Sequence, residues 1–319
     1  MDYILKSDTN IEKQALVIGA AGIDIVGHLQ GEFTSGTSNP ANIRTSYGGV
    51  ARNVAENLAR LGQPVKLLTV VGDDETGQQL LQSTANAGVD IGDVLRLSNQ
   101  PTSTYLAIIG SRGNVEFAID DMRIINELSP VFFHDHWESF LNASILFIDA
   151  NLSREALRTV MSLARKAKIP VCADPVSRTL ATKLKPYLNR LHLITPNSYE
   201  AGILCERSIT PSNRRQTMEA AKCLVSQGVD IAIIALGQFG VCYATTEMSG
   251  RIPAIQTEIV DPTGAGDALT ATVIFAMLNN IPLDDALRLG VSAASLTLSH
   301  RGTVLPDLSV EKLYDHLVI

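Results

Sequence analysis

The sequence predicts an α/β fold, with a mostly parallel sheet covered by helices on both faces and a second, smaller sheet beside it. From residue 145 onward, short apolar segments alternate with amphipathic ones, a pattern typical of βαβ crossovers. The segments within 24–47 and 102–120 are short and polar, which suits exposed strands outside the core. Hydrophobic residues make up 45% of the 319 residues and charged residues 18%, a balance that supports a large core.

The first part of the chain contributes to both sheets. The expected elements are, in order, strands at 16–19, 24–30 and 41–47, a helix at 50–61, a buried strand at 65–71 and a helix at 74–87. The helix at 50–61 follows Gly48-Gly49, carries apolar residues at every third or fourth position and ends before Gly62. This spacing gives it one apolar face that can pack on a sheet.

The rest of the chain reads as a hairpin, an alternating α/β region and two final helices. The expected elements are strands at 102–109 and 115–119, a strand at 145–149, a helix at 153–167, strands at 170–174 and 191–195, a helix at 214–227, a strand at 230–236, a second hairpin at 240–255, and helices at 265–279 and 284–299. The last two helices are apolar on nearly all sides, so both should be buried. No linker or repeat interrupts the pattern, so we expect residues 1–319 to form a single domain.

Charge and composition exclude several functions. There are 26 basic and 33 acidic residues, a net charge of −7, so we expect no nucleic-acid partner, which would require a basic face. No run of ~18 apolar residues occurs, and residues 1–14 are polar, so we expect no membrane span, no signal peptide and a cytoplasmic protein. The four cysteines are far apart, so we expect free thiols and no zinc site.

The strongest local signal is Asp261-Pro262-Thr263-Gly264-Ala265-Gly266-Asp267, followed directly by an apolar helix. The small residues 264–266 allow a tight turn, and the helix that follows presents unpaired amide groups and a positive dipole end. These features favour an anion site, with Asp267 placed to accept a proton from a substrate hydroxyl. We expect the dipole to keep Asp267 ionised at neutral pH. An ordinary helix-capping Asp would show the same local pattern.

This segment resembles the C-terminal signature of the ribokinase-like (PfkB) family of sugar and nucleoside kinases. Three further segments match that family in its order and spacing: residues 47–55 (YGGVARNVA), 195–200 (TPNSYE) and 236–240 (LGQFG). The resemblance covers about residues 15–310. It implies a ribokinase-like three-layer sandwich with a small β-sheet lid, formed here within 24–47 and 102–120. It also implies ATP as phosphoryl donor with Mg²⁺, and in many relatives a monovalent cation such as K⁺.

The resemblance assigns roles to matching residues of this chain. It places Asp267 as the catalytic base and Gly264, Ala265 and Gly266 as the anion hole. On the substrate side it names Asp24 for two sugar hydroxyls, Gly48 and Gly49 for close approach of the substrate ring, Asn53 as a donor and acceptor to ring hydroxyls, and Asn151 for the far side of the ribose.

On the nucleotide side, the resemblance names Asn197 and Glu200, with Glu200 orienting water molecules on Mg²⁺. Gly237 and Gly240 would let the chain pass beneath the nucleotide. Asp261 and Thr263 would help bind the monovalent cation, with the 301–302 segment closing that site. From the residues alone, Glu200 is equally explained as a favourable charge at a helix N-terminus, and Gly237 and Gly240 as the entry to a plain hairpin.

Within the family, the lid segments are most similar to those of pseudouridine kinases. The supporting stretches are 38–43 (SNPANI), the GGVARN form of the first signature, 102–106 (TSTYL), 120–122 (DDM) and 174–177 (DPVS). Asn39, Asn42 and Thr104 would read the amide edges of a uracil ring, although these side chains could equally face solvent. The function implied is transfer of phosphate to the 5′-hydroxyl of pseudouridine, with ribokinase or another sugar or nucleoside kinase as the alternative.

Two other classes of function are weighed against a kinase. A non-catalytic sugar-sensing protein could retain the pocket, but we would expect it to lose Asp267 or its glycines. A nicotinamide-dependent oxidoreductase is disfavoured because Gly19-Ala20-Ala21-Gly22 lacks the G-x-G-x-x-G pattern and precedes a strand. We also expect a homodimer formed through the lid, with Ile108, Phe117 and Ile119 as the apolar contact face.

Overall fold

The computed structural model describes residues 14–110 and 115–317. Its centre is an eight-stranded sheet with the order β14-β13-β12-β11-β10-β9-β1-β4. The strands are β14 (Ser249–Ile252), β13 (Val241–Ala244), β12 (Ile231–Ala235), β11 (Leu193–Ile194), β10 (Val171–Asp174), β9 (Ala143–Asp149), β1 (Gln14–Ile18) and β4 (Val65–Leu68). Neighbours from β12 to β4 pair in parallel, while β13 pairs antiparallel with both β12 and β14, which confirms the mostly parallel sheet.

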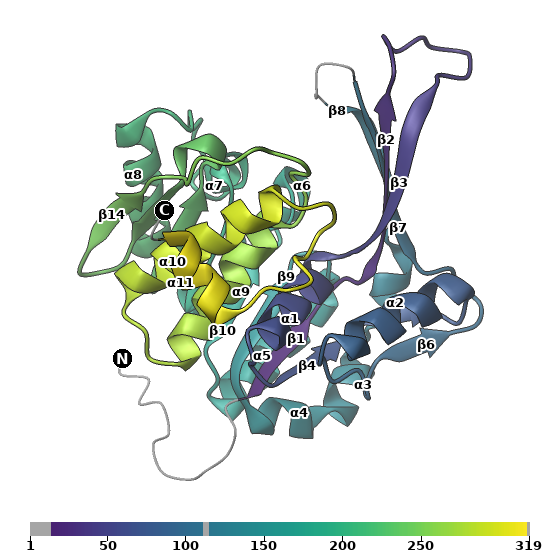
Figure 1. The fold of residues 1–319 in the computed structure, drawn as a ribbon. Helices are drawn as coiled ribbons and strands as arrows, with labels where there is room; N and C mark the ends of the chain where they lie inside the picture. Colours follow the sequence, from purple (N-terminus) through teal and green to yellow (C-terminus); the bar gives the residue numbers. More distant parts are fainter. Residues whose placement is uncertain (1–13, 111–114, 318–319) are drawn as a thin grey trace.

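Helices cover this sheet on both faces and produce three layers (Figure 1). One face packs on α1 (Val50–Arg60), α9 (Ala265–Leu278) and α10 (Leu283–Leu298). The other packs on α3 (Pro130–Asp135), α4 (Trp137–Asn142), α5 (Arg154–Ala167), α7 (Ser198–Leu204) and α8 (Arg214–Ser226). Successive residues of β1 alternate between the two clusters, and all but the first are buried, as expected for a strand covered on both faces.

The remaining elements are short. They are α2 (Glu75–Asn86), α6 (Arg178–Ala181), α11 (Val310–Leu317), strands β5 (Val70–Gly72) and β6 (Leu95–Leu97), and the 3₁₀ helices η1 (Arg123–Glu127), η2 (Lys185–Arg190) and η3 (Gly237–Phe239). The prediction of one strand at 65–71 is wrong. The segment divides at Thr69, whose hydroxyl donates to the Gly19 carbonyl, and β5 then pairs with β6 outside the central sheet.

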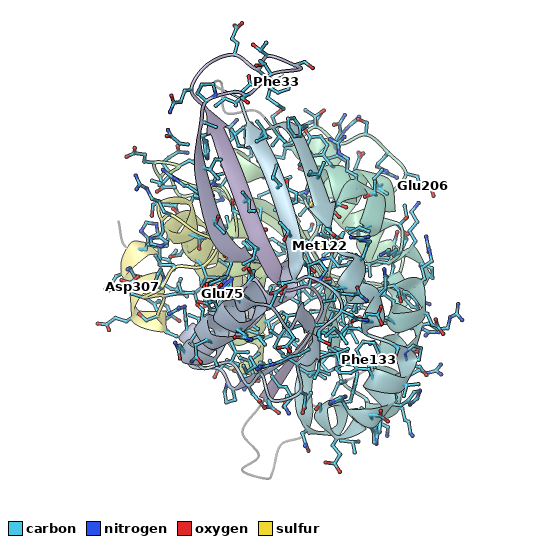
Figure 2. All side chains as sticks on the ribbon, turned by 90° about the vertical axis from the view of Figure 1, so that its right-hand side faces the viewer. Phe33, Glu75, Met122, Phe133, Glu206 and Asp307 are labelled. Carbon is cyan, nitrogen blue, oxygen red and sulfur yellow. The ribbon has the colours of Figure 1, made fainter. Side chains whose placement is uncertain are left out.

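A separate four-stranded sheet has the order β3-β2-β7-β8 and forms the lid. Its strands are β3 (Ala41–Gly48), β2 (Gly22–Leu29), β7 (Ser103–Ile109) and β8 (Val115–Asp121). Figure 1 shows the lid standing away from the three layers, and Figure 2 shows it face-on with Phe33 at its far end. The predicted antiparallel pairing of 102–109 with 115–119 is confirmed, whereas the turn predicted at 111–114 lies outside the described residues.

The pairing register gives the lid two different faces. Asp24 pairs with Ser46 and Tyr105, and Tyr105 pairs with Asp120, so these polar side chains share one face. The opposite face carries apolar pairs, including Ile108 with Phe117 and Leu106 with Ile119. Because Asp24 lies close to charged groups of the body, the polar face points toward the carboxyl ends of the central strands.

Candidate active site

The candidate residues gather where the parallel strands end, which is where ligands bind in open α/β sheets. Residues 19–21 follow β1, Asp149 ends β9, Asp174 ends β10, Asn197 follows β11, and Gly237 follows β12. The N-terminus of α9 lies across these ends, since the Thr270 hydroxyl donates to the Thr195 hydroxyl at 2.9 Å. Segments far apart in sequence therefore form one site.

The turn before α9 leaves an open space at the helix N-terminus. Gly264 adopts a φ of 80°, and a Cβ atom there would lie 1.9 Å from the Thr303 carbonyl oxygen, so only glycine fits. A Cβ at Gly266 would instead meet no atom within 4 Å. Within the described chain no side chain caps α9. Its first amides thus have no side-chain partner, which is compatible with an anion site, and the assignment of residues 264–266 to that site stays a prediction.

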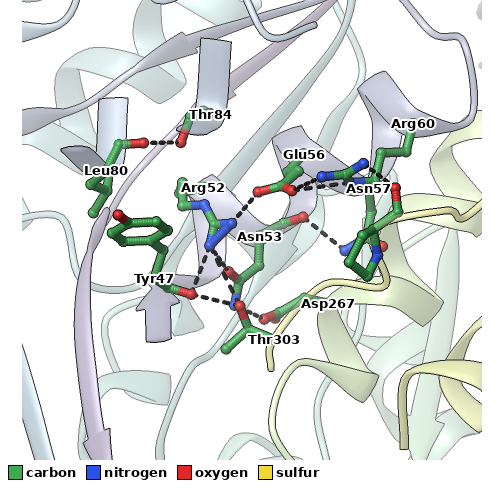
Figure 3. Close-up of polar contacts among 11 residues, drawn as sticks. Tyr47, Arg52, Asn53, Glu56, Asn57, Arg60, Leu80, Thr84, Asp267 and Thr303 are labelled. Atoms are coloured by element: carbon green, nitrogen blue, oxygen red, sulfur yellow. Dashed lines mark hydrogen bonds and ion pairs between the residues drawn. The ribbon is translucent and has the colours of Figure 1, made fainter. Parts of the chain in front are cut away.

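Asp267 lies in the first turn of α9 and is held from α1. The side-chain amide of Asn53 donates to Asp267 Oδ2 at 2.7 Å (Figure 3). The pKa of Asp267 is raised to about 7, chiefly by burial; the nearby Asp24 and Asp149 carboxylates act in the same direction, and Asn53 and Arg52 act in the opposite one. The expectation that the helix dipole keeps Asp267 fully ionised is therefore wrong, because desolvation and neighbouring negative charge outweigh the dipole.

Asp24 reaches the same site from the lid. Its carboxylate lies against Gly48, where a Cβ atom would come within 2.2 Å of Oδ2. Gly49 adopts a φ of 92°, and a Cβ there would lie 2.4 Å from the Ala20 carbonyl oxygen. In this structure the two glycines thus admit Asp24 and the end of β1, whereas the sequence interpretation reserved that space for a substrate ring. The pKa of Asp24 is raised to about 6, chiefly by burial, with the Arg52 charge lowering it and the Asp261 charge raising it.

Asp149, which sequence reasoning passed over, connects the segment after β1 with the start of α1. It is fully buried and accepts backbone N–H groups from Ala20, Ala51 and Asn151 at 2.8, 3.1 and 2.9 Å. Burial raises its pKa, against the effect of these bonds. Asn151 lies two residues further on, and its backbone N–H donates to Asp149 rather than to any residue of the lid. The available signal was an Asp at the end of a buried strand, a position the sequence also shows at Asp174.

The nucleotide-side residues form a capping box at the start of α7. Asn197 accepts the N–H groups of Tyr199 and Glu200, and the Glu200 carboxylate accepts the Asn197 backbone and side-chain N–H groups at 2.8 and 2.7 Å. The helix-terminus interpretation of Glu200 is thus correct, whether or not it also serves a metal. Glu200 is buried, and burial raises its pKa.

Asp174 lies beside Glu200 and is a second residue that sequence reasoning did not assign. Burial raises its pKa well above the ordinary value, and the charges of Glu200 and Asp267 add to that effect. It accepts the backbone N–H of Val176, a β-branched residue with a φ of 64°, at 2.7 Å. A positive φ at valine is costly and often marks a functional loop.

The two remaining nucleotide-side glycines differ in their surroundings. Gly237 has a φ of 59° and open space beside it, whereas Gly240 leaves no room for a Cβ, which would lie 2.1 Å from the Ile252 carbonyl oxygen. Gly240 is therefore required by the β13–β14 hairpin region. Gly237 alone of the two lies beside open space at the end of β12.

Asp261 ties together the two loops that the sequence interpretation named for a monovalent cation. Its carboxylate accepts the backbone N–H and hydroxyl of Thr263 at 3.0 and 2.6 Å and the Gly302 N–H at 3.3 Å. Among residues 14–110 and 115–317, no three His, Cys, Asp or Glu side chains are grouped as ligands for a metal ion. Asp261 thus holds the loop in the form that Gly264 requires.

The lid residues predicted to read a base are not all brought together. Asn42 shares the face of Asp24 but lies four residue pairs along the strand, and Gln30 donates to its side chain at 3.4 Å. Asn39 holds its own loop by bonds with Thr34. Thr104 pairs with Ile23 and therefore lies on the opposite face, so the structure does not bring it together with Asp24.

The lid residue that does lie beside Asp24 is Tyr105, which sequence reasoning missed. It pairs directly with Asp24, and its ring is half-buried. Burial and the Asp24 and Asp120 charges raise its pKa, so the phenol remains a hydrogen-bond donor. Alternation along each strand shows only that Thr104 and Tyr105 lie on opposite faces. The pairing register between β2 and β7 decides which of the two shares the face of Asp24, and the sequence does not give that register.

This geometry suits transfer of a group with negative charge to a hydroxyl. The α9 N-terminus can bind the anion, Asp267 has a pKa near neutrality for accepting a proton, and Asp24 lies close enough to interact with it electrostatically. A hydroxyl held between the two carboxylates would face the open space at Gly266. The site therefore brings an open helix N-terminus and two carboxylates together, an arrangement suited to an anion and a hydroxyl.

Comparison with known proteins agrees with this chemistry. A family model described as pfkB family carbohydrate kinase matches residues 12–309. Pseudouridine kinase from Escherichia coli K12 is 34% identical over 296 residues, covering 92% of this chain and 93% of the relative. The uncharacterized sugar kinase YeiI of the same organism is also 34% identical, covering 94% of this chain and 82% of the relative.

A solved structure shows the same fold. Arabidopsis thaliana ribokinase, crystallised with ribose and ATP, superposes with a TM-score of 0.83 at 22% identity, covering 97% of this chain and 99% of that one. The described residues include no helix both long and apolar enough to cross a membrane.

Proposed function

Because the chain belongs to the pfkB family of carbohydrate kinases, and is thus a phosphotransferase with an alcohol group as acceptor, we propose that it phosphorylates the 5′-hydroxyl of pseudouridine with ATP. The observation that carries this proposal is Asp267, held by Asn53 at the open N-terminus of α9 and facing Asp24. The two carboxylates can accept a hydrogen bond and a proton from a hydroxyl nucleophile, and the open N-terminus of α9 can bind the oxygens of a phosphoryl group.

In the proposed reaction, the substrate hydroxyl oxygen forms a bond to the γ-phosphorus of ATP as the bond from that phosphorus to the β–γ bridging oxygen breaks. The hydroxyl proton passes to Asp267, and ADP leaves. The first amides of α9, at 264–267, stabilise the negative charge on the transferring group. Asp24 orients the sugar by accepting a hydrogen bond from a hydroxyl.

The residues present suit Mg²⁺. Two neighbouring carboxylates, the half-buried Asp174 and the buried Glu200, repel each other, and a divalent cation with its water molecules would relieve that repulsion. Bound there, the ion would neutralise phosphate charge. For K⁺, the proposal rests on the Asp261 loop, which joins Thr263 to Gly302 and so brings together the two segments the family pattern names.

Pseudouridine is favoured as substrate by a match over nearly the whole chain and by a polar lid face that carries Tyr105 beside Asp24. Tyr105 offers a flat ring and a hydroxyl, which suit a base joined to a sugar. The equal identity to the sugar kinase YeiI supports the alternative of a sugar substrate. The coarser conclusion, a sugar or nucleoside kinase, holds for either.

We also propose one kinase domain over residues 1–319 that pairs with a second copy through the lid. The family match is continuous over 12–309, and the lid strands lie inside it. Phe117 and Ile119 are 42% and 61% exposed on the apolar lid face, and a partner sheet would cover them. The four unpaired cysteines support a cytoplasmic location.

A substrate panel tests the function. ATP is mixed with pseudouridine, uridine, adenosine, ribose or fructose, and ADP release is measured with the D267N variant as the inactive control. We expect kcat/KM to favour pseudouridine over uridine by about tenfold to a hundredfold, because the extra ring N–H of pseudouridine satisfies an acceptor that uridine leaves unpaired. A preference for ribose or fructose would contradict the proposal of a nucleoside substrate, and only the assignment to the kinase family would stand. No ADP release with any acceptor would favour a sugar-sensing protein.

A further inference from the structure

Arg52 is a buried cation on α1, one residue before Asn53. Only 3% of the side chain is exposed. Its Nη1 donates to the Tyr47 carbonyl at 2.7 Å and to Asn53 Oδ1 at 3.0 Å, and its Nη2 pairs with Glu56 (Figure 3). A charge at this depth is costly to bury, so these contacts must be favourable to keep it there.

The guanidinium decides which way the Asn53 amide points. Arginine has only donors, so the atom of Asn53 that faces Arg52 must be the amide oxygen. The amide nitrogen then faces Asp267 Oδ2 at 2.7 Å. The oxygen and nitrogen of an Asn side chain are often ambiguous, but here a cation on one side and a carboxylate on the other leave a single consistent orientation.

This orientation changes what Asn53 can offer a substrate. One lone pair of its oxygen accepts from Arg52 and one of its N–H groups donates to Asp267, so only the remaining lone pair and N–H are left for a ring hydroxyl. In the described part of the chain, Asp267 Oδ1 has no hydrogen-bond partner. One carboxylate oxygen is thus held and the other is available to the nucleophile.

Arg52 also bears on the charge of Asp267. The groups that face Asp267 are Asp24 from the lid, Asp149 and Asp174 from the ends of β9 and β10, and Asn53 and Arg52 from α1. The three carboxylates favour its neutral form. Arg52 favours the ionised form, both by its own charge and through the Asn53 amide that it orients.

We propose that Arg52 is a positioning residue of the active site, which locks the Asn53 amide with its N–H toward Asp267 and keeps one Asp267 oxygen free as the proton acceptor. The inference rests on the proposed kinase function for its catalytic consequence, although the orientation itself does not. Arg60 provides a matched control. It pairs with the same Glu56 from the next turn of α1 but makes no contact with Asn53.

The first experiment needs no substrate. The free energy of unfolding is measured by urea denaturation from pH 4.5 to 9 for the wild type, R52M, R52K and R60M, each with and without D267N. For each protein, the free energy of unfolding with D267N is subtracted from that without it. The pH dependence of this difference reports the pKa of Asp267 in that protein. We expect a midpoint near 7 in the wild type and in R60M, and a midpoint about one unit higher in R52M. R52K should lie between them, since it keeps the charge but loses the planar fork.

The second experiment measures turnover with the best acceptor from the panel. We expect R52M to lower kcat about tenfold while the KM for ATP stays unchanged, and to move the acidic limb of the rate profile to higher pH. R60M should leave both unchanged. If no acceptor is phosphorylated, the proposed function fails while the unfolding experiment still decides the role of Arg52.

A further variant covers the case in which R52M is too unstable to fold. R52M/E56L removes both halves of the buried pair, a replacement that is often neutral for stability. The same upward shift of the Asp267 midpoint is expected in this background. A midpoint in R52M or R52M/E56L equal to that of the wild type would overturn the proposal, and so would an equal shift in R60M.

Discussion

Asp267 is a carboxylate whose surroundings work against its charge, and this has a measurable consequence. A base with a pKa of about 7 is half protonated at neutral pH, so it accepts a proton readily from a hydroxyl that becomes acidic during transfer. An ordinary surface Asp would be a much weaker base. Burial is the largest cause of this raised pKa, and the value suits the proton transfer proposed for Asp267.

We expect D267N to lower kcat by ~10²–10⁴, the range typical of a lost general base, with little change in ATP binding. In the wild type, kcat/KM should rise with pH through about 7 and level above it, because the ionised carboxylate is the active form. The check is a pH–rate profile of both proteins. A profile for the wild type that is flat from pH 5.5 to 8.5, or near-normal turnover by D267N, would remove Asp267 from this role.

At the scale of elements, the N-terminus of α9 differs from its neighbours because two glycines there have opposite environments. Gly264 is enclosed by the Thr303 backbone, whereas Gly266 faces open space. Substitutions at the two positions should therefore separate folding from catalysis.

We expect G266V to keep the melting temperature within a few degrees of the wild type and to lose nearly all activity, because its side chain would occupy the space proposed for phosphate oxygens. G264A should instead unfold at a lower temperature, since a Cβ there collides with backbone and the φ of 80° disfavours alanine. Thermal melts and ATP turnover of both variants provide the measurement. An active G266V at saturating ATP would contradict the placement of the anion hole.

The arrangement of the lid strands leads to a separate prediction about the preference for pseudouridine over uridine. Tyr105 lies beside Asp24, and Thr104 lies on the opposite face of the same strand. We expect Y105F to reduce the preference for pseudouridine over uridine severalfold, with a smaller effect on kcat, because a hydroxyl near the substrate is lost. T104V serves as the control and should leave the preference unchanged. Ratios of kcat/KM for the two nucleosides decide this, and a larger effect from T104V would place the base on the other face.

At the scale of the whole molecule, the apolar face of the lid predicts association of two copies. F117K should give a monomer, because a lysine would introduce a charge into the proposed contact. E116K, which changes charge on the neighbouring position of the same strand, is the matched control and should remain dimeric. Sedimentation at micromolar concentration distinguishes the two states. A wild-type monomer, with or without nucleoside and ATP, would exclude the lid as a dimer contact.

Sequence periodicity was sufficient for the three layers because buried parallel strands and amphipathic helices leave strong local patterns. It failed at Thr69, where a hydrogen bond to Gly19 transfers the chain from one sheet to another without a break in hydrophobicity. The residues of the candidate site also fall into two groups, those that a local sequence pattern reveals and those that it does not. Asp24, Asn53 and Asp267 lie in recognisable segments, but the role of Asp149 depends on the backbone amides of Ala20 and Ala51, which are distant in sequence, and no local pattern records that.

The protonation of Asp267 and the choice between Thr104 and Tyr105 were beyond the sequence for a related reason. The first depends on the charges that tertiary folding collects around one carboxylate. The second depends on strand register, and a shift of one residue exchanges the two faces. Both depend on residues that folding brings together from distant parts of the sequence.

The lid contributes none of its described strand residues to the two large clusters that hold the central sheet between its helices. Apart from Asp24, positions on its polar face therefore escape most of the purifying selection that acts on a packed interior. A gene duplicate could accumulate changes around Tyr105 and acquire a new acceptor while inheriting Asn53 and Asp267 intact. Relatives of this chain should accordingly diverge fastest in β2, β3, β7 and β8, and ancestral reconstructions should recover exchanges of substrate without loss of the chemistry.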